Sequence, residues 1–253
     1  LGDDATLGWE QWDVVNNRLD LLSEMDLVWK NDFGLRLSAA AWYDHAYSDD
    51  NSHPGYNKYL EGPASQGLYA DTYGAISAAP GHITDDAEDL HYRGAELLDA
   101  FVFANFNFDN GMGASIRAGR HTIYWGNSLL FGGAIHGVAG GMTTLDGEKA
   151  FGVPGAEAKE LFRPTNKLSG TWQINPNLSL VGYLSLEFEE HRLMYAHTYH
   201  SQAEGINNDD EFVTLLPGLI DPDTLASIAP RSGLVQIGEE KPDDTGEWGV
   251  GVN

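Results

Sequence analysis

The sequence predicts an all-β fold, namely a transmembrane antiparallel β-barrel of the outer-membrane type. Apolar and polar residues alternate along segments of about nine to eleven residues, the length that a tilted strand needs to cross a bilayer. Short turns join these segments in alternation with connections of roughly forty to fifty residues, as in membrane barrels. Aromatic residues also gather at the segment ends, where a barrel meets the two membrane interfaces. A soluble β-sandwich or β-helix with long insertions is the alternative interpretation.

The composition excludes several classes of protein. The chain has 253 residues, no cysteine and a formal net charge of −24. Without cysteine there is neither a disulfide framework nor a thiolate that could bind a metal or act as a nucleophile. The acidic balance argues against nucleic acid as a partner, because phosphates would be repelled. No apolar run is long enough for a transmembrane helix, and an aromatic content of 11% argues against disorder.

The first predicted hairpin covers residues 18–47 and turns at residues 31–34. Successive side chains of a strand point to opposite faces, so each arm has an apolar and a polar face. On the first arm the two faces are Leu19, Leu21, Met25, Leu27 and Trp29 against Asp20, Glu24 and Asp26. On the return arm they are Leu37, Ala39, Ala41 and Tyr43 against Arg36, Ser38 and Asp44.

The second predicted hairpin covers residues 93–125, and Asp109-Asn110-Gly111 supplies residues that a tight turn favours. The apolar face of its first arm is predicted to consist of Leu98, Ala100, Val102, Ala104, Phe106 and Phe108. The return arm continues this face with Ala114, Ile116 and Ala118. Asp99 and Arg117 are placed on the opposite face.

A third hairpin is predicted over residues 165–189, with its turn at residues 175–177, and a last strand over residues 248–252. Residues 155–162 favour a short helix between the second and third hairpins. Seven strands do not close a bacterial barrel, which has an even strand number, and an open edge in lipid leaves backbone groups unsatisfied. We therefore expect residues 1–253 to form a single β-barrel domain that is incomplete at its C-terminal end.

The polar faces define candidate lumen-facing residues. If the apolar faces contact lipid, the set pointing into the barrel is Glu24, Asp26, Arg36, Asp44, Asp99, Arg117, Lys167, Glu187 and Glu189. Such residues form either a structural network of paired charges or the lining of a substrate path, and both interpretations stay open. Their mixed signs argue against a single-ion filter built from a charged ring.

The long connections carry more apolar sequence than water-exposed loops should. The clearest example is residues 128–142, which contain no Asp, Glu, Lys or Arg. This segment either enters the barrel as a plug or packs with the other connections as an extracellular cap. The candidates for a constriction inside the barrel are Leu129, Phe131, Ile135 and Val138.

The sequence offers no catalytic motif, and we expect no enzymatic activity. Neither a G-x-S-x-G elbow nor a phosphate-binding loop is present. His121 and Ser128 lie near one another at a strand end, which is more simply explained as a polar strand end that faces headgroups. Two further polar groups match no zinc or calcium template and are interpreted as solvated loops, so neither a metal nor a cofactor is expected. They are His191, His197 and His200, and Asp85, Asp86, Glu88 and Asp89.

Several motifs resemble one family of proteobacterial outer-membrane proteins, catalogued as domain of unknown function 1302. They are WYDHAYSD (42–49), AGRHTIYWGNSLLF (118–131), PGAEAKELFRP (154–164), LSLVGYLSLEFEEHRL (178–193) and DDTGEWGV (243–250). The likeness extends from about Arg18 to the end of the chain. It implies a large barrel in the outer membrane of a Gram-negative bacterium, surrounded by lipid and lipopolysaccharide. It assigns no catalytic residues.

The resemblance also implies traffic in hydrophobic molecules. Members of that family are often encoded beside esterases, sterol or aromatic catabolism, exporters and a periplasmic lipoprotein family. We therefore expect a channel or transport component for lipids, sterol-like compounds or esters. The first alternative is a structural barrel that recruits a periplasmic lipoprotein or an exporter, and the second is an outer-membrane esterase.

Overall fold

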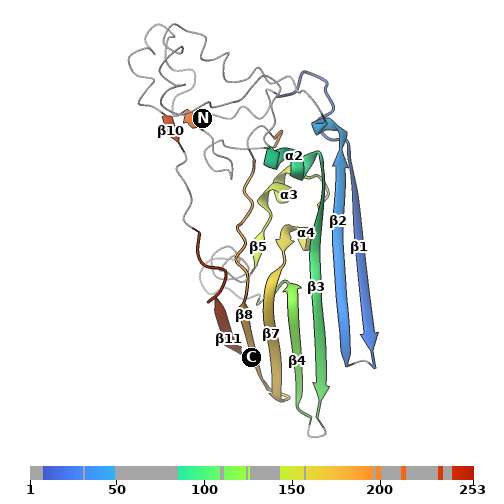
Figure 1. Cartoon of the computed structure of the whole chain (residues 1–253), viewed down its shortest axis with the longest axis vertical. Coiled ribbons are helices and arrows are strands. Elements are labelled where there is room, and N and C mark those ends of the chain that lie inside the picture. Colours follow the sequence, from blue (N-terminus) through green and yellow to red (C-terminus); the bar gives the residue numbers. More distant parts are fainter. Residues whose placement is uncertain are drawn as a thin grey trace.

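A computed structural model describes residues 8–30, 32–48, 85–108, 111–123, 125, 143–156, 158–195, 198–200, 212–214, 233–235 and 241–253. Its main feature is one curved antiparallel sheet of seven strands in the order β1-β2-β3-β4-β7-β8-β11 (Figure 1). The strands are β1 Arg18–Trp29, β2 Phe33–Asp44, β3 Arg93–Asn107, β4 Gly113–His121, β7 Thr165–Asn175, β8 Leu178–Ser185 and β11 Trp248–Val252. This confirms the predicted antiparallel all-β class. The sheet is open in the described part of the chain, with β1 and β11 at its edges.

The three predicted hairpins are confirmed, and their short turns lie together at one end of the sheet (Figure 1). The connections that leave the other end are long: residues 45–92, 122–164 and 186–247. Two strands are shorter than predicted. Strand β4 ends at His121, close to Gly119 with its positive φ of 122°, and β8 ends at Ser185.

One face of the sheet is apolar and exposed. A row of cross-strand neighbours shows this most directly, since it is apolar on all seven strands: Leu27, Leu35, Val102, Ala118, Leu168, Leu184 and Trp248. The exposed large side chains of this face include Leu19, Leu21, Met25, Trp29, Phe33, Tyr43, Leu97, Phe106, Ile116, Trp172, Val250 and Val252. We call it the outward face. The other side of the sheet is the inward face.

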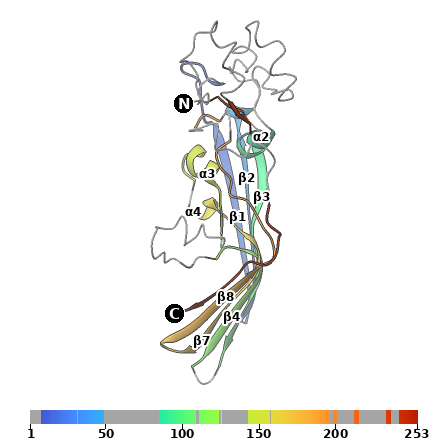
Figure 2. The ribbon, with the colours of Figure 1, turned by 90° about the vertical axis from the view of Figure 1, so that its left-hand side faces the viewer.

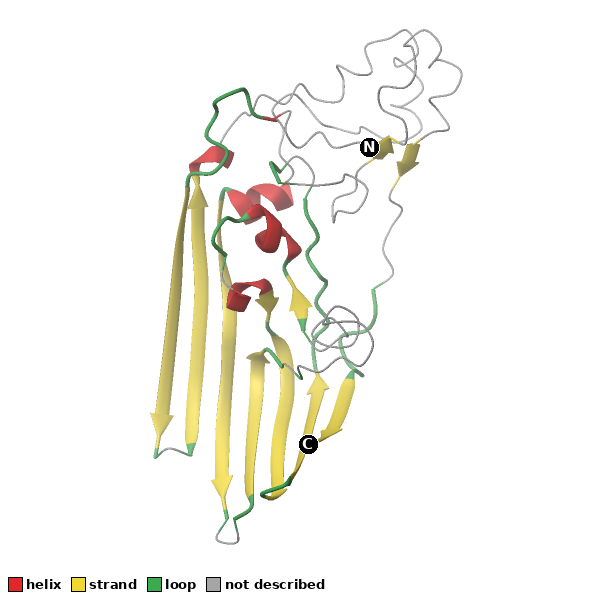
Figure 3. Ribbon diagram, turned by 180° about the vertical axis from the view of Figure 1, so that it is seen from behind, coloured by secondary structure: helices red, strands yellow, loops and turns green. Residues whose placement is uncertain are grey.

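Short helices cover part of the inward face. They are α2 Asp85–His91, α3 Gly147–Gly152 and α4 Ala158–Leu161, and α3 and α4 lie on the side toward which the sheet curves (Figure 2). The two-residue strands β5 Thr144–Leu145 and β6 Phe162–Arg163 pair beside them. We call residues 143–164 the insert. Seen from behind, the helices gather near the end of the sheet that bears the long connections (Figure 3).

The remaining elements are small. The 3₁₀ helix η2 spans His45–Tyr47, and β9 Phe212–Thr214 pairs with β10 Gly233–Val235 in a separate ladder. Among the described residues, the helix predicted over residues 155–162 is present as the four residues of α4, while α2 and α3 are additional to the prediction. Among the described helices, none has the length and apolar character that a membrane crossing requires.

A β-bulge reverses the faces of the upper half of β3. Leu37 of β2 pairs with Ala100, but Ala39 pairs with Leu97, so two residues of β3 oppose Ser38. A bulge adds one residue to one strand and thereby shifts the alternation of its side chains. Leu97 is consequently 52% exposed on the outward face, and Leu98 is 6% exposed on the inward face. The prediction that Leu98 lies outward together with Ala100 was wrong for this reason.

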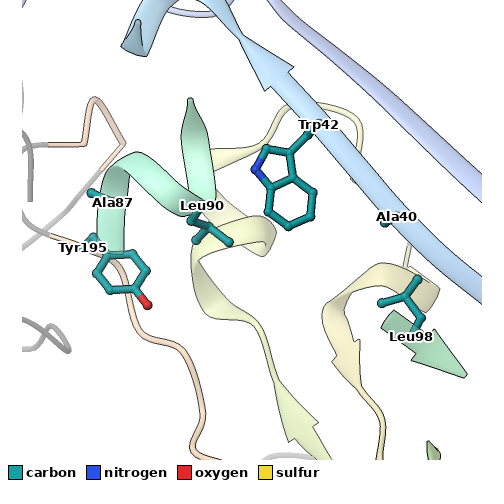
Figure 4. Close-up of a cluster of buried hydrophobic side chains, with 6 residues drawn as sticks. All are labelled: Ala40, Trp42, Ala87, Leu90, Leu98 and Tyr195. Atoms are coloured by element: carbon teal, nitrogen blue, oxygen red, sulfur yellow. The ribbon is translucent and has the colours of Figure 1, made fainter. Parts of the chain in front are cut away.

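The hydrophobic core lies on the inward face, between the sheet and the helices. It consists of Ala40, Trp42, Ala87, Leu90, Leu98 and Tyr195 (Figure 4). The indole Nε1 of Trp42 donates to the carbonyl of Asp89 at 3.2 Å. Two cations lie near its ring centroid, Arg18 at 5.4 Å and Lys149 at 4.7 Å. The core therefore fixes α2 against β2 and β3, and the contact of Lys149 with Trp42 places α3 beside it.

Candidate functional site

The first charged cluster of the inward face surrounds Arg36. Its guanidinium pairs with Glu24 at 2.8 Å, with Asp26 at 3.0 Å and with Asp99 at 3.1 Å. These residues come from β1, β2 and β3, and Asp26 and Arg36 are direct cross-strand neighbours. We call this group the Arg36 cluster. It unites four of the nine predicted lumen-facing residues.

The Arg36 cluster is open to solvent and negatively charged. The side chain of Arg36 is 31% exposed, and those of Glu24 and Asp26 are 38% and 52% exposed. The planar guanidinium donates in several directions at once, which suits it to hold three carboxylates. Such exposed pairs contribute little to folding stability. The cluster therefore positions charge on the inward face more than it stabilises the sheet.

The second charged cluster is buried and surrounds Glu96. Its carboxylate lies 3.0 Å from Lys149 Nζ, 3.4 Å from Arg192 Nη1 and 3.5 Å from Arg163 Nε. These four side chains are between 4% and 21% exposed. Arg192 also pairs with Asp146 at 2.8 Å. Burial opposes the charge of Arg192, but the carboxylates of Glu96 and Asp146 outweigh it and raise the pKa of the guanidinium.

The Glu96 cluster continues toward β8 through Arg163 and one further arginine, Arg120. Arg163 pairs with Glu189 at 2.9 Å, and Arg120 pairs with Glu187 at 3.2 Å. Glu187 and Glu189 thus join the charged network expected of lumen-facing residues. The whole network ties β3 to the insert and to the segment after β8. Together with the core, it borders a cavity of about 410 Å³ on the inward face.

Sequence reasoning missed the centre of this network. Glu96 is an even number of residues away from Ala100 and Val102, which point outward, so regular alternation would place it outward as well. The bulge opposite Ser38 turns it inward. The partners that were missed are Arg120, Asp146, Lys149, Arg163 and Arg192. One signal was available, since Asp146 precedes α3 and its carboxylate accepts from the Lys149 amide at 2.8 Å as a helix cap.

A buried histidine–carboxylate pair joins α2 to α3. His91 Nε2 and Glu148 Oε1 are 2.5 Å apart, with side chains that are 1% and 0% exposed. The second oxygen of Glu148 accepts from the Tyr195 amide at 2.7 Å. The His91 ring stacks on Tyr47, with 4.5 Å between ring centroids. These contacts all lie between structural elements, so the pair fastens the helices together.

Three other predicted lumen-facing residues have separate environments. Asp44 is fully buried and accepts from the amides of Asn17 and Ala46, both at 2.9 Å, so it holds the start of β1 and of η2. Lys167 is only 2% exposed. The guanidinium of Arg117 lies over the Phe101 ring, 5.7 Å from its centroid.

The histidine at the end of β4 hydrogen-bonds to a serine of β7, and Ser128 lies outside the described residues. His121 Nε2 is 2.7 Å from Ser169 Oγ, and Nδ1 is 2.8 Å from the carbonyl of Gly119. With Nδ1 donating to Gly119, Nε2 accepts from the hydroxyl. A backbone carbonyl orients the imidazole but does not supply the negative charge that stabilises an imidazolium in serine hydrolases.

The remaining predicted groups do not form a metal site among the described residues. The amide of Leu145 donates to His191 Nδ1 at 2.9 Å, and burial lowers the pKa of His191. His200 instead packs edge-on against Tyr199. His197 and the four constriction candidates, Leu129, Phe131, Ile135 and Val138, lie outside the described residues. The acidic residues at 85–89 belong to α2 instead of a loop.

Comparison with known proteins supports the family resemblance. A family model described as "Protein of unknown function (DUF1302)" matches residues 1–253, the whole chain. No curated protein and no solved structure matches the chain.

Proposed function

The chain belongs to the DUF1302 family, and we propose that it forms part of the wall of an outer-membrane β-barrel that conducts hydrophobic molecules. The observation that carries this proposal is the outward face. Its central row is apolar on all seven strands, from Leu27 on β1 to Trp248 on β11. Soluble monomers rarely expose contiguous apolar patches larger than a few hundred Å². Contact with lipid accounts for a sheet that is apolar outside and charged inside.

The dimensions of the outward face fit a bilayer. Its apolar positions on β1 run from Leu19 to Trp29, and their partners on β2 run from Tyr43 to Phe33 without a charged residue. Ten steps of about 3.3 Å give roughly 33 Å along the strand. At the strand tilt of about 35–45° found in membrane barrels, this corresponds to an apolar band of about 25 Å, the height that such barrels show.

The open edges support a barrel of more than seven strands. In the described part of the chain, β1 and β11 each pair with one neighbour. Within lipid, every unpaired backbone group at such an edge costs several kcal/mol. We therefore propose that further strands complete the wall in the outer membrane of a Gram-negative bacterium, with lipid and lipopolysaccharide around it.

The inward face provides both open and closed regions. A cavity of about 610 Å³ lies over β4, β7, β8 and β11, and one of about 360 Å³ lies between β1–β3 and the insert. The Glu96 cluster and the core occupy part of the inward face near the long connections, beside a cavity of about 410 Å³. This partial filling favours a second candidate function, a barrel that docks a periplasmic lipoprotein or an exporter without conducting solutes.

Uptake into Gram-negative cells separates these two functions. Expression of the full-length protein should accelerate entry of the hydrophobic dye N-phenylnaphthylamine several-fold, because the dye then bypasses the lipopolysaccharide leaflet. Entry of the hydrophilic substrate nitrocefin should stay unchanged. Equal acceleration of both would indicate a nonspecific leak. If neither entry rate changes although the protein is folded in the membrane, the conduit proposal fails and the docking barrel is favoured.

Cysteine labelling tests the sidedness that the proposal requires. The chain has no cysteine, so single substitutions introduce unique thiols. Glu10→Cys lies at the end that bears the long connections and should react with an impermeant maleimide on intact cells. Asn177→Cys, in the short turn between β7 and β8, should react only after the outer membrane is permeabilised. The reverse pattern would invert the topology, and equal reaction in both states would contradict a membrane-spanning wall.

A further inference from the structure

We propose that the cavity between strands β1–β3 and the insert binds an amphipathic cation, that is, a molecule with an apolar body and a protonated amine. The inference rests on the proposed function, because it specifies the chemical class of the hydrophobic cargo. It depends on three features of the inward face: an apolar cavity, a polar cluster at one side of it, and the excess of negative charge in that cluster.

The cavity has a volume of about 360 Å³ and mainly apolar walls. Leu22 and Leu98 line it from the strands, while Ile123 and Phe162 line it from the connection between β4 and β7. Its size lies at the lower end of the range of small-molecule sites, which are apolar with a few convergent polar groups. It therefore accommodates a body of one or two fused rings, or a short alkyl chain.

The polar side of the cavity is formed by the Arg36 cluster. Glu24, Arg36 and Asp99 line the cavity, and Asp26 shares the same guanidinium at 3.0 Å. In the described ion pairs of this cluster, three carboxylates and one guanidinium carry a net charge of −2. Arg117 also acts electrostatically on Asp99 and reduces this net charge to −1, and its guanidinium lies over the Phe101 ring.

This charge balance selects the sign of the ligand. An ammonium group placed beside Glu24 and Asp99 would take up the excess negative charge and form charge-assisted hydrogen bonds, which are the stronger kind. A carboxylate or sulfate at the same place would meet like charges. The net charge of −24 of the whole chain also concentrates cations near the protein. Neutral molecules of the same shape would gain only the apolar contacts.

Three fluorescent probes of nearly equal shape test this selection: 1-naphthylmethylamine, 1-naphthylmethanol and 1-naphthylacetate. Their binding to the micelle-solubilised full chain is measured by equilibrium dialysis, with empty micelles as the blank. We expect the amine to bind about tenfold more tightly than the alcohol, as one charge-assisted contact allows. The anion should bind more weakly than the alcohol. Equal affinity of all three probes, or no binding of the amine, would overturn the proposal.

A matched pair of double variants locates the site. Glu24→Gln with Asp26→Asn should lower the affinity for the amine to about that of the alcohol, and leave the alcohol unchanged. Asp243→Asn with Asp244→Asn removes the same charge from exposed positions far along the chain and should change neither affinity. Equal loss in both double variants would show attraction to the whole molecule instead of a site.

The outcomes for cargo binding and for transport are distinguishable. Selective binding of the amine without accelerated dye entry would refute the conduit but retain the cation site. Accelerated dye entry without selective binding of the amine would refute the cation site but retain the conduit.

Discussion

Replacement of Glu96 by Gln is expected to lower the free energy of unfolding by about 3–5 kcal/mol, the cost of removing one partner from a buried ion pair. The carboxylate is surrounded by Lys149, Arg163 and Arg192, whose side chains are 4%, 10% and 21% exposed. A neutral amide would leave these cations buried with too little negative charge. The insert should also detach from the sheet in this variant, because Lys149 and Arg163 belong to the insert.

Denaturant titration of the folded full chain in lipid vesicles, followed by tryptophan fluorescence, measures this loss. The control is Glu190→Gln, whose side chain is 36% exposed and pairs with Lys241, which is 57% exposed. An exposed pair of this kind should contribute about 0–1 kcal/mol. If Glu96→Gln lowers the free energy of unfolding no more than the control does, other carboxylates neutralise the three cations. The Glu96 cluster then does not hold the insert.

The alternation of side chains predicted most of the sheet because one face is apolar along each whole strand. On β1 and β2 every predicted outward residue, from Leu19 to Tyr43, is in its expected place. The alternation fails on β3 above Ala100, where the bulge opposite Ser38 inserts one residue. The sequence does not reveal this bulge, because Leu97 and Leu98 are consecutive leucines. Either of them could supply the apolar residue of the outward face.

The short helices were less predictable for an energetic reason. Helices of four to seven residues are not stable alone and derive their stability from tertiary packing. In α2 the packed residues are Ala87 and Leu90, at the i, i+3 spacing of one helix face. Four acidic residues surround them in the sequence, and this composition also suits a solvated loop. Only the contacts with Trp42 and Tyr195 decide for the helix.

The two charged clusters also differ in how well the sequence predicts them. The Arg36 cluster follows from register, because Asp26 and Arg36 are cross-strand neighbours in a hairpin whose turn is visible in the sequence. The Glu96 cluster combines β3, the insert and the segment that contains Arg192. These parts are distant in sequence, and their contact depends on how the long connections fold back. No period or turn signal specifies such contacts.

The largest effect outside the charged clusters is expected on the outward face, where Val102→Arg should lower the free energy of unfolding from lipid by about 2–4 kcal/mol. Val102 is 55% exposed and lies between Leu35 and Ala118 in the central apolar row. Its position well inside β3 places an arginine near the bilayer midplane, where neither water nor a counter-charge is at hand. The cost should fall as the substituted position approaches the short turns.

The matched control is Thr171→Arg, which starts from a side chain of the same shape on the inward face. Thr171 is exposed, pairs with Ser115 and lines the cavity of about 610 Å³. An arginine there remains in contact with water and should change stability by only about 0.5 kcal/mol. Unfolding titrations of both variants from the same vesicles give the comparison. A strong asymmetry is what lipid contact requires, since only a hydrocarbon surrounding penalises charge on the side of the sheet that is already exposed. Equal small effects would mean that water covers both faces, and equal large effects would mean that a protein core covers both.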